Sequence, residues 1–174
     1  MLESDERLLS DARALCVAAH AGQKRANGQP YHTHPAAVVN LLIENGMREA
    51  EVLAAAFLHD VLEDTKTSRK QIVERFGKRV AKLVDEMTIE PEDQKSFESK
   101  QAALLAHARV MSADGKWIKL ADRLHNLREK LSFSGDDKRK RYAQASLNLL
   151  EALAPWPSEE LAKEIRTLAE QFVQ

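Results

Sequence analysis

The segment 52–62 constrains the fold more than any other part of the chain, because it is apolar on nearly every side. This pattern is typical of a helix buried in the middle of a domain. Four ionisable side chains interrupt or directly follow it: His59, Asp60, Glu63 and Asp64. On an ideal helix these four fall within one wedge of about 140°.

The grouping of these four side chains favours a metal site. Burying them without compensation would cost a large amount of free energy. A divalent cation supplies that compensation, because imidazole and carboxylate both ligate it and its charge offsets the carboxylates. The alternative is a polar network under a loop or a buried ion-pair cluster. No Lys or Arg lies between His59 and Thr65 to supply the cation for such a cluster.

Length and composition limit the remaining possibilities. The 174 residues predict a single domain, residues 1–174, with one sizeable core. The net charge of −1 gives no electrostatic reason to expect nucleic acid or a membrane surface as a partner. Cys16 is the single cysteine, which excludes a disulfide framework and predicts a small core residue.

Targeting signals are missing from the sequence. Residues 1–10 are acidic and contain no hydrophobic signal segment, and no apolar run is long enough to span a bilayer. We therefore expect a cytoplasmic protein, and the sequence leaves the formation of a homo-oligomer open.

Hydrophobic periodicity is helical almost throughout, which predicts an all-α fold. Gly77 is expected to break one helix, Asp114 and Gly115 to form a turn, and residues 132–140 to form a loop. Thr33 is a candidate N-cap. The helices are expected at about residues 5–20, 33–46, 48–62, 67–76, 80–87, 97–111, 116–131, 141–153 and 158–172.

The candidate metal ligands come from three different predicted helices: His34, His59, Asp60 and Asp122. Asp122 lies in a mostly apolar helix, where an isolated acid needs a partner. Structural roles are open for two of them. His34 could be a histidine at a helix start, and Asp122 could pair with Arg123 or Lys119.

Several separated motifs together resemble a known family. They are GQKRANGQPY at 22–31, His34-Pro35, HDVLEDT at 59–65, Phe76-Gly77, and KLADRLHNLR at 119–128. They look like the hydrolase domain of RelA/SpoT homologues, which belongs to the HD superfamily of metal-dependent phosphohydrolases. The resemblance covers about residues 12–153, and the compact form is similar to the small alarmone hydrolases.

This resemblance implies a fold, a cofactor and a reaction. The fold would be an all-α HD-domain helical bundle with its metal site among the central helices. One Mn²⁺ would be held by His34, His59, Asp60 and Asp122. The reaction would remove the 3′-pyrophosphate of guanosine tetraphosphate or pentaphosphate, the (p)ppGpp of the stringent response. The donor set alone suits Mn²⁺, Fe²⁺, Zn²⁺ and Ni²⁺ almost equally.

The resemblance also implies roles for individual residues. Glu63 and Asp64 match the family pair that positions and activates the attacking water. Arg25 matches a base-stacking arginine, and Asn126 matches a nucleotide-contacting asparagine. Lys24 and Asn27 lie beside Arg25 in the same predicted loop and are expected to contact the substrate with it.

The chain departs from the family pattern at two places that concern the substrate. Ala26 stands where a second basic residue is common, and residues 89–96 match poorly the segment rich in Asp and Lys. Contacts to the distal phosphates are therefore poorly defined. The basic residues that could substitute are Lys95, Lys100, Lys138, Arg139 and Arg141.

Two alternatives to an alarmone hydrolase are considered. The first is a related HD-domain phosphohydrolase that acts on another nucleotide, such as one that removes the extra ribose phosphate of NADPH. The second is a non-catalytic nucleotide-binding module. The acids Glu63 and Asp64 argue against the second, because a pure binding module has no need of groups that activate water.

Overall fold

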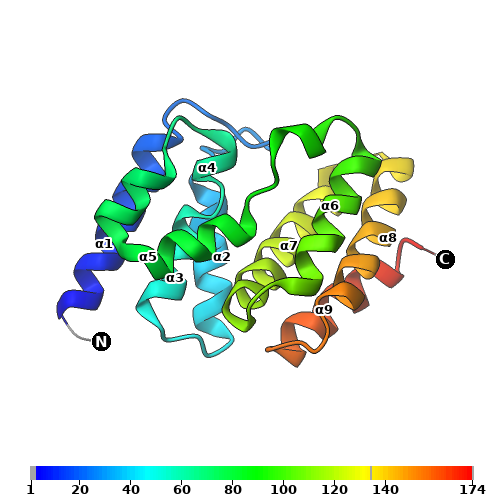
Figure 1. The fold of residues 1–174 in the computed structure, drawn as a ribbon. Coiled ribbons are helices and arrows are strands. Elements are labelled where there is room, and N and C mark those ends of the chain that lie inside the picture. The colour runs from blue at the N-terminus through cyan, green and yellow to red at the C-terminus, as the bar shows by residue number, and fades with distance from the viewer. Residues whose placement is uncertain (1–2, 134, 174) are drawn as a thin grey trace. The chain divides into compact units, whose positions relative to one another are not determined.

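A computed structural model describes residues 3–133 and 135–173, and the secondary structure of this part is helical without strands. The predicted all-α class is confirmed. None of the helices in these ranges has the length and hydropathy needed to cross a membrane. The elements (Figure 1) are α1 (Glu3–Ala19), α2 (Thr33–Glu44), α3 (Ala50–Leu58), α4 (Val61–Asp64), α5 (Arg69–Met87), the 3₁₀ turn η1 (Pro91–Gln94), α6 (Phe97–Val110), α7 (Ala113–Phe133), α8 (Asp136–Ala152) and α9 (Glu159–Glu170).

The chain divides into two units, the first ending at Thr88 and the second beginning at Ile89. In the first unit, α3 is the central helix and contacts α1, α2 and α5 (Figure 1). All seven residues from Val52 to Leu58 are buried. Burying a side chain such as Leu53 or Phe57 contributes roughly 1.5–3 kcal/mol. The apolar segment of the sequence is therefore the core of this unit.

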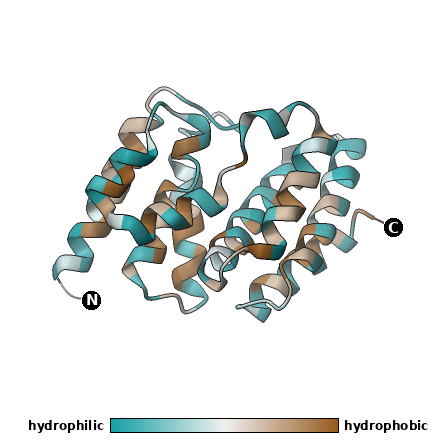
Figure 2. Ribbon diagram, viewed as in Figure 1, coloured by the Kyte–Doolittle hydropathy of each residue, from teal (hydrophilic) through white to brown (hydrophobic). Residues whose placement is uncertain are grey.

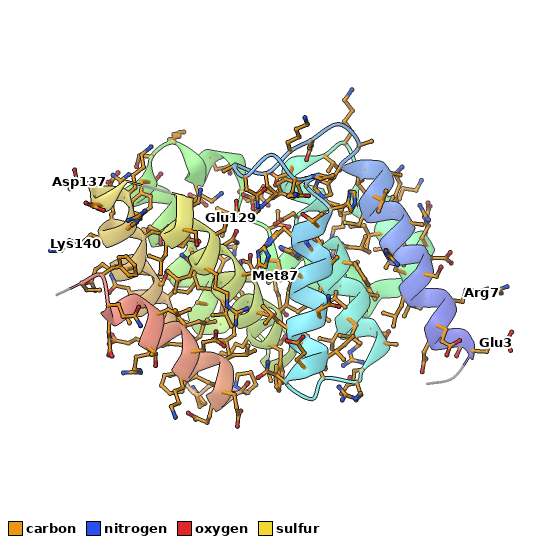
Figure 3. All side chains as sticks on the ribbon, turned by 180° about the vertical axis from the view of Figure 1, so that it is seen from behind. Glu3, Arg7, Met87, Glu129, Asp137 and Lys140 are labelled. Carbon is orange, nitrogen blue, oxygen red and sulfur yellow. The ribbon has the colours of Figure 1, made fainter. Side chains whose placement is uncertain are left out.

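The first helix, α1, is amphipathic as its spacing predicts. Ala12 and Cys16 are buried against the unit, one turn apart. Glu3 and Arg7 project from the opposite side into solvent (Figure 3). Figure 2 shows the same mixture of hydrophobic and hydrophilic residues along the other long helices. Such helices bury one face and leave the other hydrated.

The predicted continuous helix 48–62 is interrupted at His59 and Asp60, which form a turn between α3 and α4. The Nδ1 atom of His59 lies 2.8 Å from the carbonyl oxygen of Ala56. In an uninterrupted helix that oxygen would accept a hydrogen bond from the N–H of residue 60. The histidine side chain therefore competes with the helical hydrogen bond where the helix breaks.

Gly77 interrupts α5, as predicted, with φ of 85° and ψ of 171°. This positive φ is open to glycine but strained for residues with a Cβ atom. Ser68 caps the start of α5, because its hydroxyl oxygen accepts a hydrogen bond from the N–H of Gln71. The side-chain oxygen of Gln71 in turn accepts a hydrogen bond from the N–H of Ser68.

In the second unit, α7 supplies the buried face predicted from its leucines, since Leu120, Leu124 and Leu127 are fully buried. The helix contacts α8 and α9. Trp156 joins the last two helices of the unit. Its indole N–H donates to the carbonyl of Leu150 at 2.7 Å, and the guanidinium of Arg166 lies 5.4 Å from its ring centroid.

Two predicted interruptions in the second unit are wrong. Asp114 and Gly115 lie inside α7, because Ser112 precedes the helix and its hydroxyl accepts from the N–H of Gly115 at 3.1 Å. The predicted loop 132–140 contains the start of α8. Gly135 is the N-cap there, and the acids Asp136 and Asp137 fall in the first turn, where the helix dipole favours negative charge. Ser134, also in the predicted loop, lies outside the described residues.

Candidate metal centre and active site

His59 is fixed in orientation at the junction of α3 and α4. It is 2% exposed, and its Nδ1 faces the carbonyl oxygen of Ala56. Because a carbonyl oxygen only accepts hydrogen bonds, Nδ1 carries the proton. In the neutral ring Nε2 then keeps the lone pair that a metal requires, and the bond to Ala56 holds the ring in that tautomer.

His34 lies in the first turn of α2 and is 1% exposed. Its ring meets the ring of His59 edge to face, with centroids 5.1 Å apart. Tyr31 makes a second edge contact with His34, at 6.3 Å. These neighbours leave the imidazole of His34 little freedom to turn.

Asp60 brings the two histidines together. Its Oδ2 atom lies 3.2 Å from Nε2 of His59 and 3.7 Å from Nε2 of His34. One ligand atom from each of the three residues falls within 4.8 Å of the others, a spacing that could hold a metal ion. Imidazole nitrogens and a carboxylate oxygen form a donor set that suits divalent transition metals. The side chains therefore fit the cation that the sequence predicts.

Glu63 and Asp64 follow one helical turn later, in α4. Asp64 is open to solvent on one side, yet partial burial raises the pKa of its carboxyl, and the charges of Asp60 and Glu63 raise it further. A hydrogen bond from Tyr31 lowers the pKa of Asp64, and so does the charge of the nearby His20. A carboxylate with a raised pKa accepts a proton more readily near neutral pH.

A pocket of about 680 Å³ opens beside the two acids. Gln23, Lys66 and Gln71 share its wall with Glu63 and Asp64. The acids are thus accessible to a solute from the polar surface around them.

The loop between α1 and α2 is folded by its own hydrogen bonds. The N–H of Arg25 donates to the carbonyl of Gln29 at 2.9 Å, and the N–H of Tyr31 donates to the carbonyl of Gln23 at 3.0 Å. The turn passes through Asn27, whose side-chain oxygen accepts from the N–H of Gln29 at 2.9 Å. Lys24 is exposed, whereas Arg25 is partly buried.

Thr33 does not cap α2 as predicted. Its hydroxyl instead donates to the carbonyl of Pro30 at 2.8 Å, and His32 occupies the N-cap position without a side-chain hydrogen bond to the helix.

Asp122 and Asn126 lie one turn apart on α7, in the second unit. The Nδ2 atom of Asn126 donates to Oδ1 of Asp122 at 2.5 Å, and Nζ of Lys119 donates to Oδ2 at 3.2 Å. Lys119 is 7% exposed, so the ion pair between Lys119 and Asp122 is well shielded from water. The structural role foreseen for Asp122, pairing with Lys119, is thus present.

Two of the basic residues considered for the distal phosphates make contacts of their own in the second unit. Arg141 lies over the ring of Phe97 at 4.5 Å, and Arg139 pairs with Asp136 at 3.2 Å. Lys95 and Lys138 are exposed and Lys100 is partly exposed, so all three have solvent access.

Tyr31 also belongs to this site, although no role was predicted for it from the sequence. Its hydroxyl lies 2.9 Å from Oδ2 of Asp60 and 2.8 Å from Oδ2 of Asp64. Burial and these two charges raise the pKa of Tyr31, so the hydroxyl remains a donor. One feature of the sequence could have indicated a role for Tyr31. It stands three residues before His34, at the end of the motif 22–31 that resembles the family.

The fold and site define a class, that of helical proteins with a cluster of histidine and aspartate side chains that could bind a metal. The HD domain family matches residues 12–155, and the chain belongs to this family.

Two curated relatives are similar in sequence. The chain is 33% identical over 174 residues to the GTP pyrophosphokinase rsh of Brucella ovis, covering 97% of this chain and 23% of the relative. It is 37% identical over 156 residues to the bifunctional (p)ppGpp synthase/hydrolase SpoT of Escherichia coli K12, covering 87% and 22%. The chain therefore spans about a quarter of the length of these relatives.

One solved structure resembles the chain over almost its whole extent. It is a metazoan ortholog of SpoT described as hydrolysing ppGpp and playing a role in starvation responses. The TM-score is 0.85 at 27% identity, and the match covers 94% of both chains. The predicted resemblance to RelA/SpoT homologues is confirmed.

Proposed function

We propose that the chain is a metal-dependent phosphohydrolase that removes the 3′-pyrophosphate of guanosine tetraphosphate or pentaphosphate. The products would be GDP or GTP and pyrophosphate. The observation that carries this proposal is the structural match to the metazoan SpoT ortholog over 94% of both chains. The match includes almost every residue of both chains, so the similarity covers the region that contains the candidate site.

The residues that would hold the metal are His34, His59 and Asp60, with Asp122 as a fourth ligand. The first three are supported by the spacing of their ligand atoms. Asp122 is supported by the resemblance to RelA/SpoT hydrolase domains, which also favours Mn²⁺ over other cations that accept nitrogen and oxygen donors. Such a cation, when bound, lowers the pKa of water and offsets charge on phosphoryl oxygens.

Glu63 and Asp64 would orient the attacking water and accept its proton. The water oxygen forms a bond to the phosphorus attached to the ribose 3′ oxygen, and the bond between that phosphorus and the 3′ oxygen breaks. The 3′ oxygen leaves with a proton, and pyrophosphate is released. The raised pKa of Asp64 suits a group that holds a proton during the reaction.

Arg25 would bind the guanine base, because a guanidinium stacks flat on a purine and also attracts phosphate. Lys24 and Asn27 lie in the same loop and would contact the nucleotide beside it. Asn126 would contact the nucleotide from α7. Since Ala26 replaces a second basic residue, we expect a weaker grip on the 5′-phosphates than in relatives with two cations.

A guanine nucleotide substrate and a single buried thiol fit a cytoplasmic protein. No partner besides the nucleotide is needed for the proposed chemistry, and a homo-oligomer is compatible with it.

The proposal is tested by a release assay on a panel of nucleotides, with Mn²⁺, Fe²⁺, Zn²⁺ and Ni²⁺ supplied in turn to the metal-free protein. We expect pyrophosphate and GDP from guanosine tetraphosphate, with the highest rate in Mn²⁺. Phosphate release from NADPH without pyrophosphate release from guanosine tetraphosphate would establish the other nucleotide as substrate. Binding of nucleotides without any turnover would identify a non-catalytic module.

A further inference from the structure

Tyr31 contacts two of the three acids that follow α3, Asp60 and Asp64. Its hydroxyl oxygen lies 2.8 Å from Oδ2 of Asp64 and 2.9 Å from Oδ2 of Asp60. Asp60 belongs to the proposed metal site, and Asp64 is a proposed catalytic acid. A single hydroxyl group therefore connects the two parts of the site.

The hydroxyl offsets repulsion between the carboxylates. Two carboxylates at close range repel each other, and a shared donor at hydrogen-bond distance from both favours keeping them together. Since the hydroxyl has one proton, it donates to one carboxylate at a time while remaining within reach of the other. The position of Asp64 relative to Asp60 therefore depends on this group.

The same loop also holds the backbone of Asp64. The side-chain Nε2 of Gln23 donates to the carbonyl oxygen of Asp64 at 2.8 Å. His20, which is 1% exposed, donates from Nδ1 to Oε1 of Gln23 at 2.7 Å. Both the side chain and the main chain of Asp64 are thus tied to the segment that leads into α2.

The ring of Tyr31 makes contacts that the hydroxyl does not. His20 stacks on it, with centroids 4.5 Å apart and an angle of 19° between the planes. The guanidinium carbon of Arg25 lies 5.5 Å from the ring centroid. A cation over an aromatic ring is attracted by the ring electrons, so the ring restrains Arg25 in its loop.

We propose that Tyr31 is a positioning residue with two separable functions: its hydroxyl places Asp64 for proton acceptance, and its ring places Arg25 for binding the base. This rests on the proposed function, in which Asp64 and Arg25 act on the nucleotide. The hydroxyl should then affect the turnover of bound substrate, whereas the ring should also affect its binding.

Two substitutions separate these functions in the metal-loaded protein. Tyr31→Phe keeps the ring and removes the hydroxyl, and we expect kcat to fall about tenfold, the loss of one hydrogen bond to a charged group, with KM within about twofold. Tyr31→Leu also removes the ring, and we expect the same loss of kcat with KM raised about fivefold, the loss of one cation–ring contact. Both variants should bind metal in the wild-type ratio.

Thr33→Val is the matched control, because it removes a hydroxyl from the same segment that bonds to Pro30 and not to the acids. Its kcat and KM should equal those of the wild type. In an Asp64→Asn background, Tyr31→Phe should cause no further loss of kcat if it acts through Asp64.

Several outcomes would overturn the assignment. The first is an unchanged kcat in Tyr31→Phe, and the second is a loss of bound metal in that variant. The third is a tenfold loss of kcat when Tyr31→Phe is added to Asp64→Asn. A KM of Tyr31→Leu equal to that of Tyr31→Phe would remove the role of the ring. The wild-type rate on guanosine tetraphosphate tests the proposed function separately. If another nucleotide is hydrolysed instead, the variant ratios are measured on that nucleotide, and absence of all turnover overturns both.

Discussion

The imidazoles of His34 and His59 meet at an interplanar angle of 73°, and the Nε2 atoms of both face the same oxygen of Asp60. The two rings come from different helices, α2 and the end of α3, which are packed in one unit. Both are buried, so their placement depends on the core around them. Such converging buried donors are stabilised when a cation binds between them.

Removing the metal should therefore lower the stability of the folded chain. We expect stoichiometric metal in the purified protein and a fall in Tm after chelation, because the cation binds the folded state alone. His59→Ala should lose both the bound metal and the dependence of Tm on added Mn²⁺. Elemental analysis and calorimetry measure the two effects. His107→Ala, which removes a histidine from α6, should change neither, and stoichiometric metal in the His59→Ala protein would contradict the assignment.

Asp122 is tested in the same way but independently, because its place among the ligands is proposed from the resemblance. Asp122→Ala should abolish turnover and lower the metal content. Lys119→Leu supplies a comparison, since it removes the neighbour of Asp122 without removing a proposed ligand. Stoichiometric metal in the Asp122→Ala protein would show that Asp122 is not a metal ligand. Its hydrogen bonds with Lys119 and Asn126 would then be structural.

Glu63→Gln and Asp64→Asn keep the shape of each side chain and remove its ability to accept a proton. We expect metal and nucleotide binding to be retained while kcat falls by about two orders of magnitude or more. The measurement combines elemental analysis with steady-state kinetics. Glu44→Gln on the surface of α2 is the control and should leave kcat unchanged. If both acid variants turn over within a few-fold of the wild type, the two acids are structural.

Arg25→Ala should lower kcat/KM about tenfold or more, roughly the loss of one stacking or charged contact. Arg25→Lys should restore little if stacking on the base dominates, because an ammonium group attracts phosphate but does not stack. Arg13→Ala on the exposed face of α1 changes net charge equally and controls for it. Unchanged kinetics in Arg25→Ala would remove this residue from the site whichever nucleotide is the substrate.

The helical class was predicted from the hydrophobic periodicity of the sequence, and His34, His59 and Asp60 were predicted to share a site. Residues 52–58 are buried as their apolar run indicated, and His34, His59 and Asp60 lie together. The break at His59 could not be predicted from periodicity, since it arises where the histidine side chain competes for the carbonyl of Ala56. The role of Tyr31 likewise depends on contacts to residues about thirty positions away, which a local pattern does not contain.

Cys16 should be unreactive in the folded protein. Burial, with a smaller contribution from the charge of Asp60, raises the pKa of its thiol from 9.0 to about 12. At pH 8 the thiolate that reacts with labelling reagents is therefore scarce. We expect negligible labelling by a disulfide reagent in buffer and full labelling in denaturant. Rapid labelling of the native protein would contradict the burial of this residue.

The same shift predicts a dependence of stability on pH. Between about pH 9 and pH 12 the unfolded thiol loses its proton while the folded thiol keeps it. The contribution of this thiol to the free energy of unfolding is therefore fully present below pH 9, and it falls by about 1.4 kcal/mol per pH unit between pH 9 and pH 12. Denaturant titrations of the wild type and Cys16→Ala isolate the effect, because the other groups that titrate in this range are common to both. Equal pH slopes in the two proteins would contradict it.

Gly77→Ala should destabilise the protein by about 1–2 kcal/mol, since the positive φ inside α5 is strained for alanine. Space is not the cause, because a Cβ atom at this position would meet no other atom within 4 Å. Gly135→Ala is the matched control: its φ is −70°, and a Cβ there also has free space. That substitution should lower the free energy of unfolding by less than Gly77→Ala, because it loses only the preference of an N-cap for glycine over alanine. Equal effects of the two substitutions in denaturant titrations would show that backbone strain at Gly77 does not set the kink in α5.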